Sequence, residues 1–384
     1  MTELTAVPIT PELVRGAVEL ETTDRGVRPH RLPATARARA EAQVLGAESC
    51  PAGVRLVLRT SATVVEVDAH RTTTSFRGMP PRPDGRFDLL VDGVPTDQQR
   101  SRGARTVVLD LATGSVETHD GPVGTVRFAG LPPREKRLEV WLPHQEPTEL
   151  VALRADAPVA PDPPGDRPVW VHHGSSISQG SNADGPTGTW PSLVARTCGV
   201  ELVNLGFSGG MMLDPFVARA IAGMPADLIS IKIGINLVNG DVMRRRAFAP
   251  AVHGFLDTVR DGHPTTPLLV VGPILCPIHE TTPGPGEADF GDGTVRFRAT
   301  GDPSEVDAGP TGKLSLQVVR EELAGVVTQR ADDALHLLDG LDLYGEGDHV
   351  ELPLPDRLHP DPAAHQLIAE RFGARAFGPG GPFA

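Results

Sequence analysis

The chain has 384 residues, enough for two domains that each build a hydrophobic core. Hydrophobic residues make up 39% of it and charged residues 22%, a composition that excludes a disordered chain and a membrane-embedded one. The net charge of −13 excludes the basic face that general nucleic-acid binding requires, so neither a nucleic acid nor a membrane is an expected partner.

The N-terminal residues lack the basic segment and apolar run that are typical of a secretory signal. Cys50, Cys198 and Cys276 are odd in number and widely spaced, which favours buried thiols over a disulfide framework or a zinc site. These features predict a cytoplasmic protein without a bound metal.

Residues 1–153 consist of short apolar runs separated by Gly and Pro. Partial alternation of apolar and polar residues predicts strands at 54–59, 62–67, 87–91, 107–109, 126–128 and 138–142. The pair Asp92-Gly93 predicts a hairpin turn after the third of these runs. Many short strands at this spacing predict a β-sandwich, jelly-roll-like accessory domain. Such a domain can bind a carbohydrate or another substrate, or only pack against the domain that follows, and both interpretations stay open.

A proline-rich linker is predicted at 154–168, because segments of this composition run extended and stiff. Its prolines are Pro158, Pro161, Pro163, Pro164 and Pro168. The domain boundary is therefore expected in this linker. At the other end of the chain, the Gly- and Pro-rich residues 378–384 predict a disordered tail.

Between residues 169 and 377, apolar β-branched runs alternate with helical patterns, which is typical of βαβ units around a parallel sheet. Strands are expected at 169–172, 201–205, 228–233, 268–271 and 335–338, and helices at 190–198, 214–222, 247–260, 314–329 and 362–375. Asp361 and Pro362 form a helix start signal, which places His359 directly before the last helix. The acidic stretch 277–312, rich in Gly and Pro, has no periodicity and predicts a lid-like insertion over an acyl or acceptor pocket.

Two separate stretches carry the chemistry. The apolar run from residue 169 breaks at Gly174-Ser175-Ser176, where a buried strand can turn sharply and present a serine at the carboxyl edge of the sheet. Asp356 and His359 follow far along the chain. A serine hydroxyl needs a base to take its proton and a carboxylate to orient that base, so these residues predict nucleophilic catalysis by a Ser/His/Asp set.

The two stretches resemble the SGNH (GDSL) family of serine hydrolases and acyltransferases. The family's blocks are G-D-S-[IL], a glycine that follows an asparagine, G-x-N and D-x-x-H. They match, in the same order, residues 174–177, 204–209, 234–236 and 356–359. The resemblance covers roughly residues 168 to 377 and implies an α/β fold with an SGNH-type, flavodoxin-like parallel sheet and flanking helices.

The resemblance also implies a role for each matched residue. Ser176 would be the nucleophile, His359 the base and Asp356 its partner. The backbone N–H groups of Ser176 and Gly209 and the side chain of Asn236 would form an oxyanion hole. Taken singly, the serine could cap a helix, the asparagine could hold its own loop and the Asp/His pair could be solvated. Because all four family blocks occur in the family's order, we favour the catalytic roles.

Two positions depart from the family pattern: Ser175 stands where the family has Asp, and Leu237 follows the G-x-N block. Neither is a triad member, but Ser175 leaves open which of the two adjacent serines is the nucleophile. Ser208 is a third candidate, because residues 206–210 read G-x-S-x-G, the nucleophile elbow of α/β-hydrolases. The departures also allow a catalytically inactive scaffold that only binds its ligand.

Four further side chains are candidates for substrate binding: Ser175, His173, Trp190 and Met211. Neighbouring residues of a strand face opposite ways, so His173 is expected at the pocket and His172 in the core. Trp190 suits a core position as well as a pocket wall, and Met211 suits the border of an acyl pocket. No carboxylate or cysteine stands at ligand spacing from the two histidines, so no metal site is predicted.

The sequence therefore predicts a serine acyl-transfer enzyme that forms an acyl-Ser176 intermediate from an ester or a thioester. The acyl group would pass to a hydroxyl of a small-molecule acceptor, a natural product or a sugar. A carbohydrate or short-chain ester hydrolase is the alternative, because both activities share the acyl-enzyme. No cofactor is expected, although an acyl thioester such as acyl-CoA can serve as co-substrate.

Overall fold

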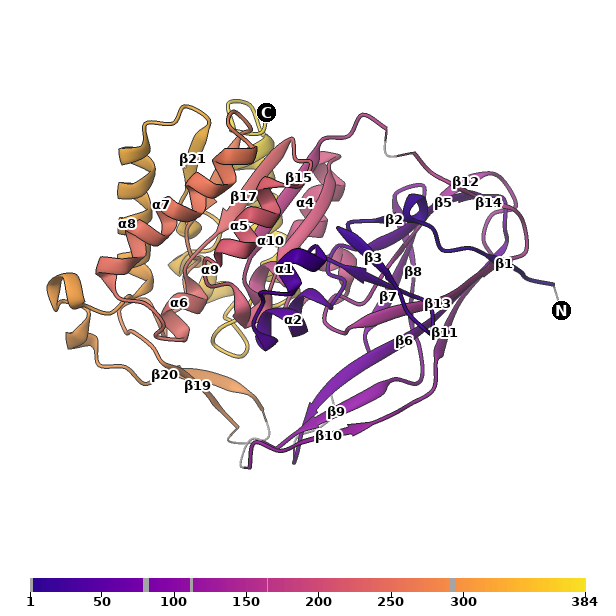
Figure 1. Ribbon diagram of the computed structural model, residues 1–384, viewed down its shortest axis with the longest axis horizontal. Helices are drawn as coiled ribbons and strands as arrows, with labels where there is room; N and C mark the ends of the chain where they lie inside the picture. The colour runs from indigo at the N-terminus through magenta and orange to yellow at the C-terminus, as the bar shows by residue number, and fades with distance from the viewer. Residues whose placement is uncertain (1–2, 79–82, 111–112, 164, 291–293) are drawn as a thin grey trace. The chain divides into compact units, whose positions relative to one another are not determined.

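The computed structural model describes residues 3–78, 83–110, 113–163, 165–290 and 294–384, and these form two compact units (Figure 1). The first unit comprises residues 1–33, 48–167 and 185–187, and the second comprises 34–47, 168–184 and 188–384. Pro164 of the expected linker and residues 291–293 of the expected insertion lie outside the described residues.

The described residues of the first unit form fourteen strands. They are β1 Thr5–Val7, β2 Val14–Arg15, β3 Glu19–Thr22, β4 Val27–His30, β5 Arg55–Thr60, β6 Val64–Phe76, β7 Arg86–Val91, β8 Val94–Arg100, β9 Arg105–Leu109, β10 Val116–His119, β11 Gly124–Ala129, β12 Lys136–Trp141, β13 Thr148–Ala155 and β14 Val159–Pro161. One sheet has the order β10-β9-β6-β13-β4-β3, with β1 beside β13 and β11 beside β6. The other has the order β14-β5-β12-β7-β8, with β2 beside β5. The predicted β-rich N-terminal domain is confirmed.

Alternation explains how these strands build a core. In β11, Val126 and Phe128 are buried while Thr125 and Arg127 are exposed, as a half-buried strand requires. The buried side chains join residues of β5, β6, β7, β12 and β13 in one apolar cluster. The predicted hairpin is also present: Asp92 and Gly93 have φ values of 51° and 82°, the left-handed pair that a type I′ turn needs.

The segment 154–168 differs from the extended linker that its prolines predict. Strand β13 runs on to Ala155, and β14 pairs with β5 at the edge of the second sheet. Pro161 is the last residue of β14. Proline lacks a backbone N–H, and an edge strand tolerates this because one of its sides pairs with no other strand. Part of the expected linker is therefore a strand of the sandwich.

The second unit contains a five-stranded parallel sheet of order β16-β15-β17-β18-β21. The strands are β15 Val169–Gly174, β16 Glu201–Gly206, β17 Leu228–Lys232, β18 Leu268–Val271 and β21 Leu335–Leu338. Each was predicted within two residues, because continuous Val, Ile and Leu runs are typical of strands buried on both faces. This order reverses direction between β15 and β17, and ligands of open α/β sheets bind at such a point.

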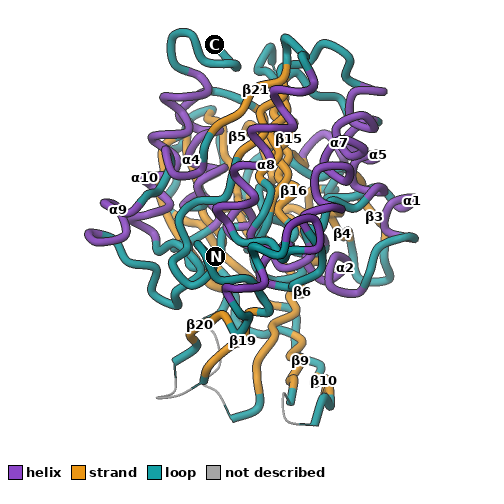
Figure 2. Tube along the Cα trace, turned by 90° about the vertical axis from the view of Figure 1, so that its left-hand side faces the viewer, coloured by secondary structure: helices purple, strands orange, loops and turns teal. Residues whose placement is uncertain are grey.

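Helices cover both faces of this sheet. They are α3 Ser176–Gln179, α4 Trp190–Cys198, α5 Pro215–Ala222, α6 Ile235–Asn239, α7 Arg245–Gly262, α8 Leu316–Arg330, α9 Glu346–Glu351 and α10 Pro362–Phe372. Figure 2 shows α4 and α10 on one side of the strands and α5 and α7 on the other. The predicted start of α10 is confirmed, since the Asp361 side chain accepts a hydrogen bond of 2.8 Å from Ala364 N. No described helix is long and apolar enough to cross a bilayer.

Three further segments differ from the sequence prediction. Residues 34–47 were assigned to the sandwich, yet they form α1 Ala34–Arg37 and most of α2 Ala42–Glu48 and belong to the second unit. The insertion 277–312 contains a hairpin of β19 Gly286–Asp289 and β20 Arg296–Ala299 rather than an aperiodic loop. Residues 378–384 are not a disordered tail, because Phe383 is buried and its ring lies 5.3 Å from that of Phe377.

Candidate active site

The turn after β15 places two serines at the start of a short helix. Ser175 is the N-cap of α3, and its side chain accepts a hydrogen bond from Ile177 N. Ser176 is the first residue of α3, so its backbone N–H has no partner within the helix. Gly180 ends the helix in the left-handed conformation, with a φ of 109° that glycine adopts without strain.

The loop before α10 brings a carboxylate and an imidazole to Ser176. Asp356 Oδ1 accepts hydrogen bonds from Leu358 N and His359 N, at 2.9 and 2.7 Å. Asp356 Oδ2 lies 2.7 Å from His359 Nδ1, and the opposite ring nitrogen, Nε2, lies 2.9 Å from Ser176 Oγ. The structure therefore joins the three predicted residues in one hydrogen-bonded chain.

The electrostatics keep the carboxylate of this chain charged. Burial alone would raise the pKa of Asp356, but hydrogen bonds from the His359 ring and from the His359 and Leu358 backbone N–H groups hold it below its ordinary value. An ionised Asp356 favours a proton on His359 Nδ1. Nε2 is then left free to accept the Ser176 proton.

The loop after β16 carries Gly209, one of the three proposed oxyanion donors. Asn204 ties this loop to α3: its side-chain amide donates to Ser178 O, and its Oδ1 accepts from Gly206 N. The following 3₁₀ turn, Ser208–Gly210, begins with Ser208 at a φ of 48°. Asn236 Nδ2 donates a 2.6 Å hydrogen bond to Ser208 O. One amide hydrogen of Asn236 is thus anchored beside Gly209, and the second has no hydrogen-bond partner among the described residues.

The structure also distinguishes the three candidate serines. His359 Nε2 meets the hydroxyl of Ser176, whereas the side chain of Ser175 caps α3 and Ser175 is 2% exposed. Ser208 contributes its carbonyl to Asn236. Leu237, the other departure from the family pattern, is fully buried in α6, so neither departure interrupts the Ser/His/Asp chain.

The side chains suggested for substrate binding are buried. Ser175 serves as a cap, and Met211 is 1% exposed. His173 is also 1% exposed: its Nδ1 lies 2.7 Å from Leu205 O and its ring stacks on Phe255. In this structure Ser175, His173 and Met211 therefore pack within the fold.

Trp190 likewise belongs to the core. It is fully buried, and its ring meets those of Trp170, His172 and Phe372. His172 is buried as expected, with hydrogen bonds to Ser230 Oγ and Ser178 Oγ. Burial lowers the pKa of His172 well below its ordinary value, so this ring stays neutral.

Two residues that sequence reasoning missed touch the acid–base loop. Asn182 Nδ2 donates to Asp356 Oδ2 over 3.2 Å. Phe297 of β20 donates its backbone N–H to Asp356 O, and its ring meets the His359 ring edge to face. Neither position carries a local pattern that would connect it to the site. Both contacts with the acid–base loop form only because the fold brings segments that are distant in the sequence together.

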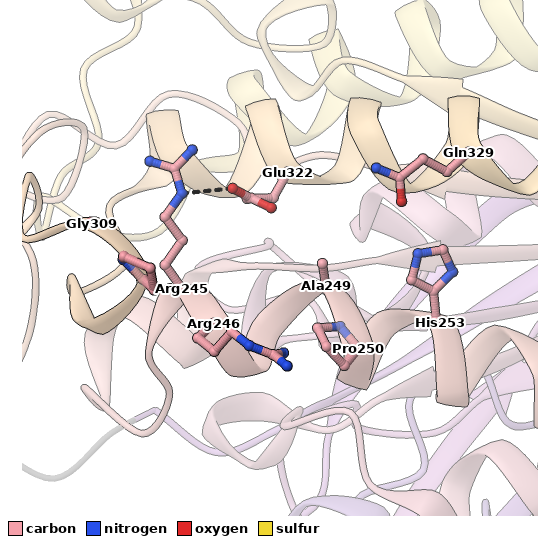
Figure 3. A pocket seen from close by; sticks show the side chains of 9 residues that line it. Arg245, Arg246, Ala249, Pro250, His253, Gly309, Glu322 and Gln329 are labelled. Carbon is pink, nitrogen blue, oxygen red and sulfur yellow. Dashed lines mark hydrogen bonds and ion pairs between the residues drawn. The ribbon is translucent and has the colours of Figure 1, made fainter.

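A separate hollow of about 550 Å³ lies between α7 and α8 (Figure 3). It is lined by Arg245, Arg246, Ala249, Pro250, His253, Gly309, Pro310, Glu322 and Gln329. Arg245 Nε donates to Glu322 Oε1 over 2.7 Å, which neutralises part of its charge. The hollow includes none of the Ser/His/Asp residues. Among the described residues, no group of His, Cys, Asp and Glu suits a metal ion.

Comparison with known proteins finds a family model for part of each unit. A model of the GDSL-like lipase/acylhydrolase family matches residues 166–276, and a model of the SsfX3 N-terminal domain matches residues 13–150. The salicylyl-acyltransferase SsfX3 from a tetracycline biosynthetic pathway is similar, with 27% identity and a TM-score of 0.76; the match covers 97% of this chain and 95% of that chain. A search of curated protein sequences found no match.

Two carbohydrate esterases of family two share the fold at lower identity. The enzyme from Clostridium thermocellum is 15% identical with a TM-score of 0.53, over 84% of this chain and 91% of that chain. The enzyme from Cellvibrio japonicus is 14% identical with a TM-score of 0.55, over 97% of both chains. The family match and the SGNH-type fold agree: residues 166–276 are similar to the GDSL-like lipase/acylhydrolase family, and the comparisons are consistent with a serine acyltransferase or esterase.

Proposed function

We propose that Ser176 carries the acyl group between a donor ester or thioester and a hydroxyl of a small-molecule acceptor. His359 Nε2 takes the Ser176 proton as Oγ attacks the acyl carbonyl, and His359 then returns that proton to the departing alcohol or thiol. The observation that carries this proposal is the continuous chain from Ser176 Oγ through the His359 ring to Asp356, with distances of 2.9 and 2.7 Å.

The tetrahedral intermediate needs donors where its negative oxygen forms. We assign the backbone N–H groups of Ser176 and Gly209 and the free amide hydrogen of Asn236 to this task. The hydrogen bond from Asn236 to Ser208 O supports the assignment, because it holds the amide beside Gly209 before substrate arrives. Preorganised donors avoid reorganisation during the reaction.

In the second half-reaction the acceptor hydroxyl takes the place of the leaving group. His359 removes its proton, the new ester bond forms, and Ser176 leaves as the free hydroxyl. The similarity to SsfX3 favours a transferase over a hydrolase, because that relative is a salicylyl-acyltransferase and matches both units of the chain. The expected donor and acceptor are therefore an acyl thioester and a hydroxylated natural product. A sugar-ester hydrolase is the second candidate, because the family two carbohydrate esterases share this fold.

The three cysteines, Cys50, Cys198 and Cys276, are free thiols. Free thiols persist in reducing compartments. This supports the cytoplasm as the expected location of the reaction.

A fluorophosphonate probe tests the nucleophile. Wild type, Ser175→Ala and Ser208→Ala should label, and Ser176→Ala should not. Labelling that is lost only in Ser208→Ala would assign the nucleophile elbow instead, and an unlabelled wild type would exclude the serine mechanism.

A second experiment measures how the acyl group is divided between an acceptor and water, which distinguishes a transferase from a hydrolase. The wild type is given an aryl thioester together with polyhydroxylated polyketides or sugars, and the products are quantified. Ester formation on the acceptor at the expense of free acid supports a transferase. Free acid alone, at every acceptor concentration, identifies a hydrolase.

A further inference from the structure

Cys276 is a buried thiol that the proposed mechanism does not use. It follows the end of β18, directly before the insertion, and it is 1% exposed. Its Sγ donates a hydrogen bond to the backbone carbonyl of Arg357 over 3.4 Å. The thiol is therefore tied to the loop that carries Asp356 and His359, although it lies far from this loop in the sequence.

The thiol keeps the proton that this hydrogen bond requires. Burial raises the pKa of Cys276 to about 12. At neutral pH the side chain is thus an uncharged thiol, which can donate its proton to an acceptor. The Arg357 carbonyl oxygen has no proton to give, so the thiol is the donor of this pair.

The carbonyl that accepts this proton belongs to the peptide group that contacts the Asp356 carboxylate. The Arg357 C=O and the Leu358 N–H are the two ends of one planar trans peptide, and they point in opposite directions. Leu358 N donates to Asp356 Oδ1 over 2.9 Å. If this peptide rotated, its N–H would leave the carboxylate and its carbonyl oxygen would approach it. The bond from Cys276 opposes that rotation.

The backbone conformation of the loop explains why it needs an anchor. Arg357 has a φ of 69°, in the left-handed region, which costs free energy for a residue with a side chain. Such a conformation persists only where its surroundings hold it. Two hydrogen bonds hold Arg357: its N–H donates to Leu354 O over 3.0 Å, and its carbonyl accepts the Cys276 thiol.

We propose that Cys276 is a positioning residue for the proposed acid–base pair. Its thiol holds the peptide between Arg357 and Leu358 in the orientation that directs the Leu358 N–H at Asp356. The Asp356 carboxylate, fixed in this way, orients the His359 ring. This inference rests on the proposed function, since it requires His359 to act as the base.

The thiol is then the outer end of one hydrogen-bonded chain. The chain runs from Cys276 through the Arg357–Leu358 peptide to Asp356, His359 and Ser176. Hydrogen bonds in such a chain polarise one another, so a peptide that accepts a proton at its carbonyl is a stronger donor at its N–H. The thiol thereby also strengthens a hydrogen bond that keeps Asp356 charged.

The first test compares wild type with Cys276→Ala, which removes the donor, and Cys276→Ser, which keeps a donor on a shorter bond. With an aryl ester, Cys276→Ala should lower kcat about three- to tenfold and leave KM within about twofold, because the lost hydrogen bond acts through the base. Cys276→Ser should recover part of this loss. Cys198→Ala is the matched control, since it removes a half-buried thiol of the same unit that lies 3.9 Å from Thr197 Oγ1. It should keep the kcat of wild type.

A spectroscopic measurement separates positioning from a loss of stability. The proton between Asp356 Oδ2 and His359 Nδ1 lies in a short, charge-assisted hydrogen bond of 2.7 Å, which should give it a far-downfield NMR resonance. This resonance should move upfield in Cys276→Ala and stay in place in Cys198→Ala. Both spectra are recorded at a temperature at which thermal melts show the variants fully folded.

A folded Cys276→Ala enzyme with the kcat of wild type, or with an unmoved resonance, would overturn the proposal. Equal losses in Cys276→Ser and Cys276→Ala would overturn it too, because the volume of the sulfur would then account for the effect. The proposed function fails by a different result, the absence of fluorophosphonate labelling in wild type. The resonance does not depend on turnover, so the two failures are distinguishable.

Discussion

The ring of Phe297 meets the ring of His359 edge to face, with centroids 5.6 Å apart and planes at 78°. Phe297 lies on β20, within the insertion, and its backbone N–H also binds Asp356 O. One residue of the insertion thus touches both members of the proposed acid–base pair. The insertion was predicted as a lid over the pocket; the described contact is with the loop that orients the base.

Phe297→Ala should lower kcat by about three- to tenfold, because an edge-to-face pair contributes on the order of 0.5–1.5 kcal/mol to holding the His359 ring. Steady-state kinetics with an aryl ester measure this loss. Arg298→Ala is the control: its side chain is on the other face of β20, where it pairs with Glu287, and it should have no effect. A Phe297→Ala enzyme with wild-type kcat would show that the ring does not position the base.

Asp356→Asn should lower kcat by roughly 1,000- to 10,000-fold, because a neutral amide no longer favours the required His359 tautomer or stabilises the imidazolium. Asn182→Ala removes a single 3.2 Å hydrogen bond to the same carboxylate and should cost less than about tenfold. The kcat of each variant is measured from pH 4 to pH 9 and compared with that of the wild type. Equal losses in the two variants would contradict the role given to the carboxylate.

Asn236→Ala should lower kcat by about 100- to 1,000-fold with little change in KM, because an oxyanion donor acts mainly in the transition state. The variant should still react slowly with the fluorophosphonate probe, since Ser176 and His359 are untouched. A kcat within threefold of wild type would show that the Asn236 amide serves only to hold Ser208 O.

Trp190→Ala should lower the free energy of unfolding by about 3–5 kcal/mol, because it empties a core site between Trp170 and Phe372. Trp190→Phe should lose less and remain folded enough for kinetics. Its KM should match wild type, as expected for a side chain that contacts no substrate. Urea titration measures the first effect. A raised KM in a fully folded Trp190→Phe enzyme would restore the pocket-wall interpretation.

Lys232→Met should stabilise the protein at pH 7 by on the order of 1–3 kcal/mol. Burial lowers the pKa of Lys232 to about 8 from an ordinary 10.5, so the charged lysine destabilises the fold at neutral pH. Between these values the unfolded chain binds more protons than the folded one, and wild-type stability should therefore rise with pH. The variant lacks this rise, so the gap between the two should narrow from pH 8 to 10. A constant gap in chemical denaturation would refute the assignment.

The sequence by itself determined the parallel sheet and pointed to the residues that we propose as the catalytic set. Continuous apolar runs predicted the five strands of the parallel sheet, β15, β16, β17, β18 and β21, and the Asp361-Pro362 signal predicted the start of α10. Periodicity and caps are local properties, set by residues that are neighbours in the chain. Ser176, Asp356 and His359 were identified because each stands at a recognisable strand end or helix start.

Only the tertiary structure decided what surrounds these residues. His173, Trp190 and Met211 stand near the site in sequence, yet all three are buried; Phe255 of α7 stacks on His173, and Phe372 of α10 packs on Trp190. Phe297 and Cys276 stand far from it and are brought to the acid–base loop. These contacts depend on how segments that are distant in the sequence pack against one another. No spacing within a single segment encodes that, because burial is set by the whole packed core.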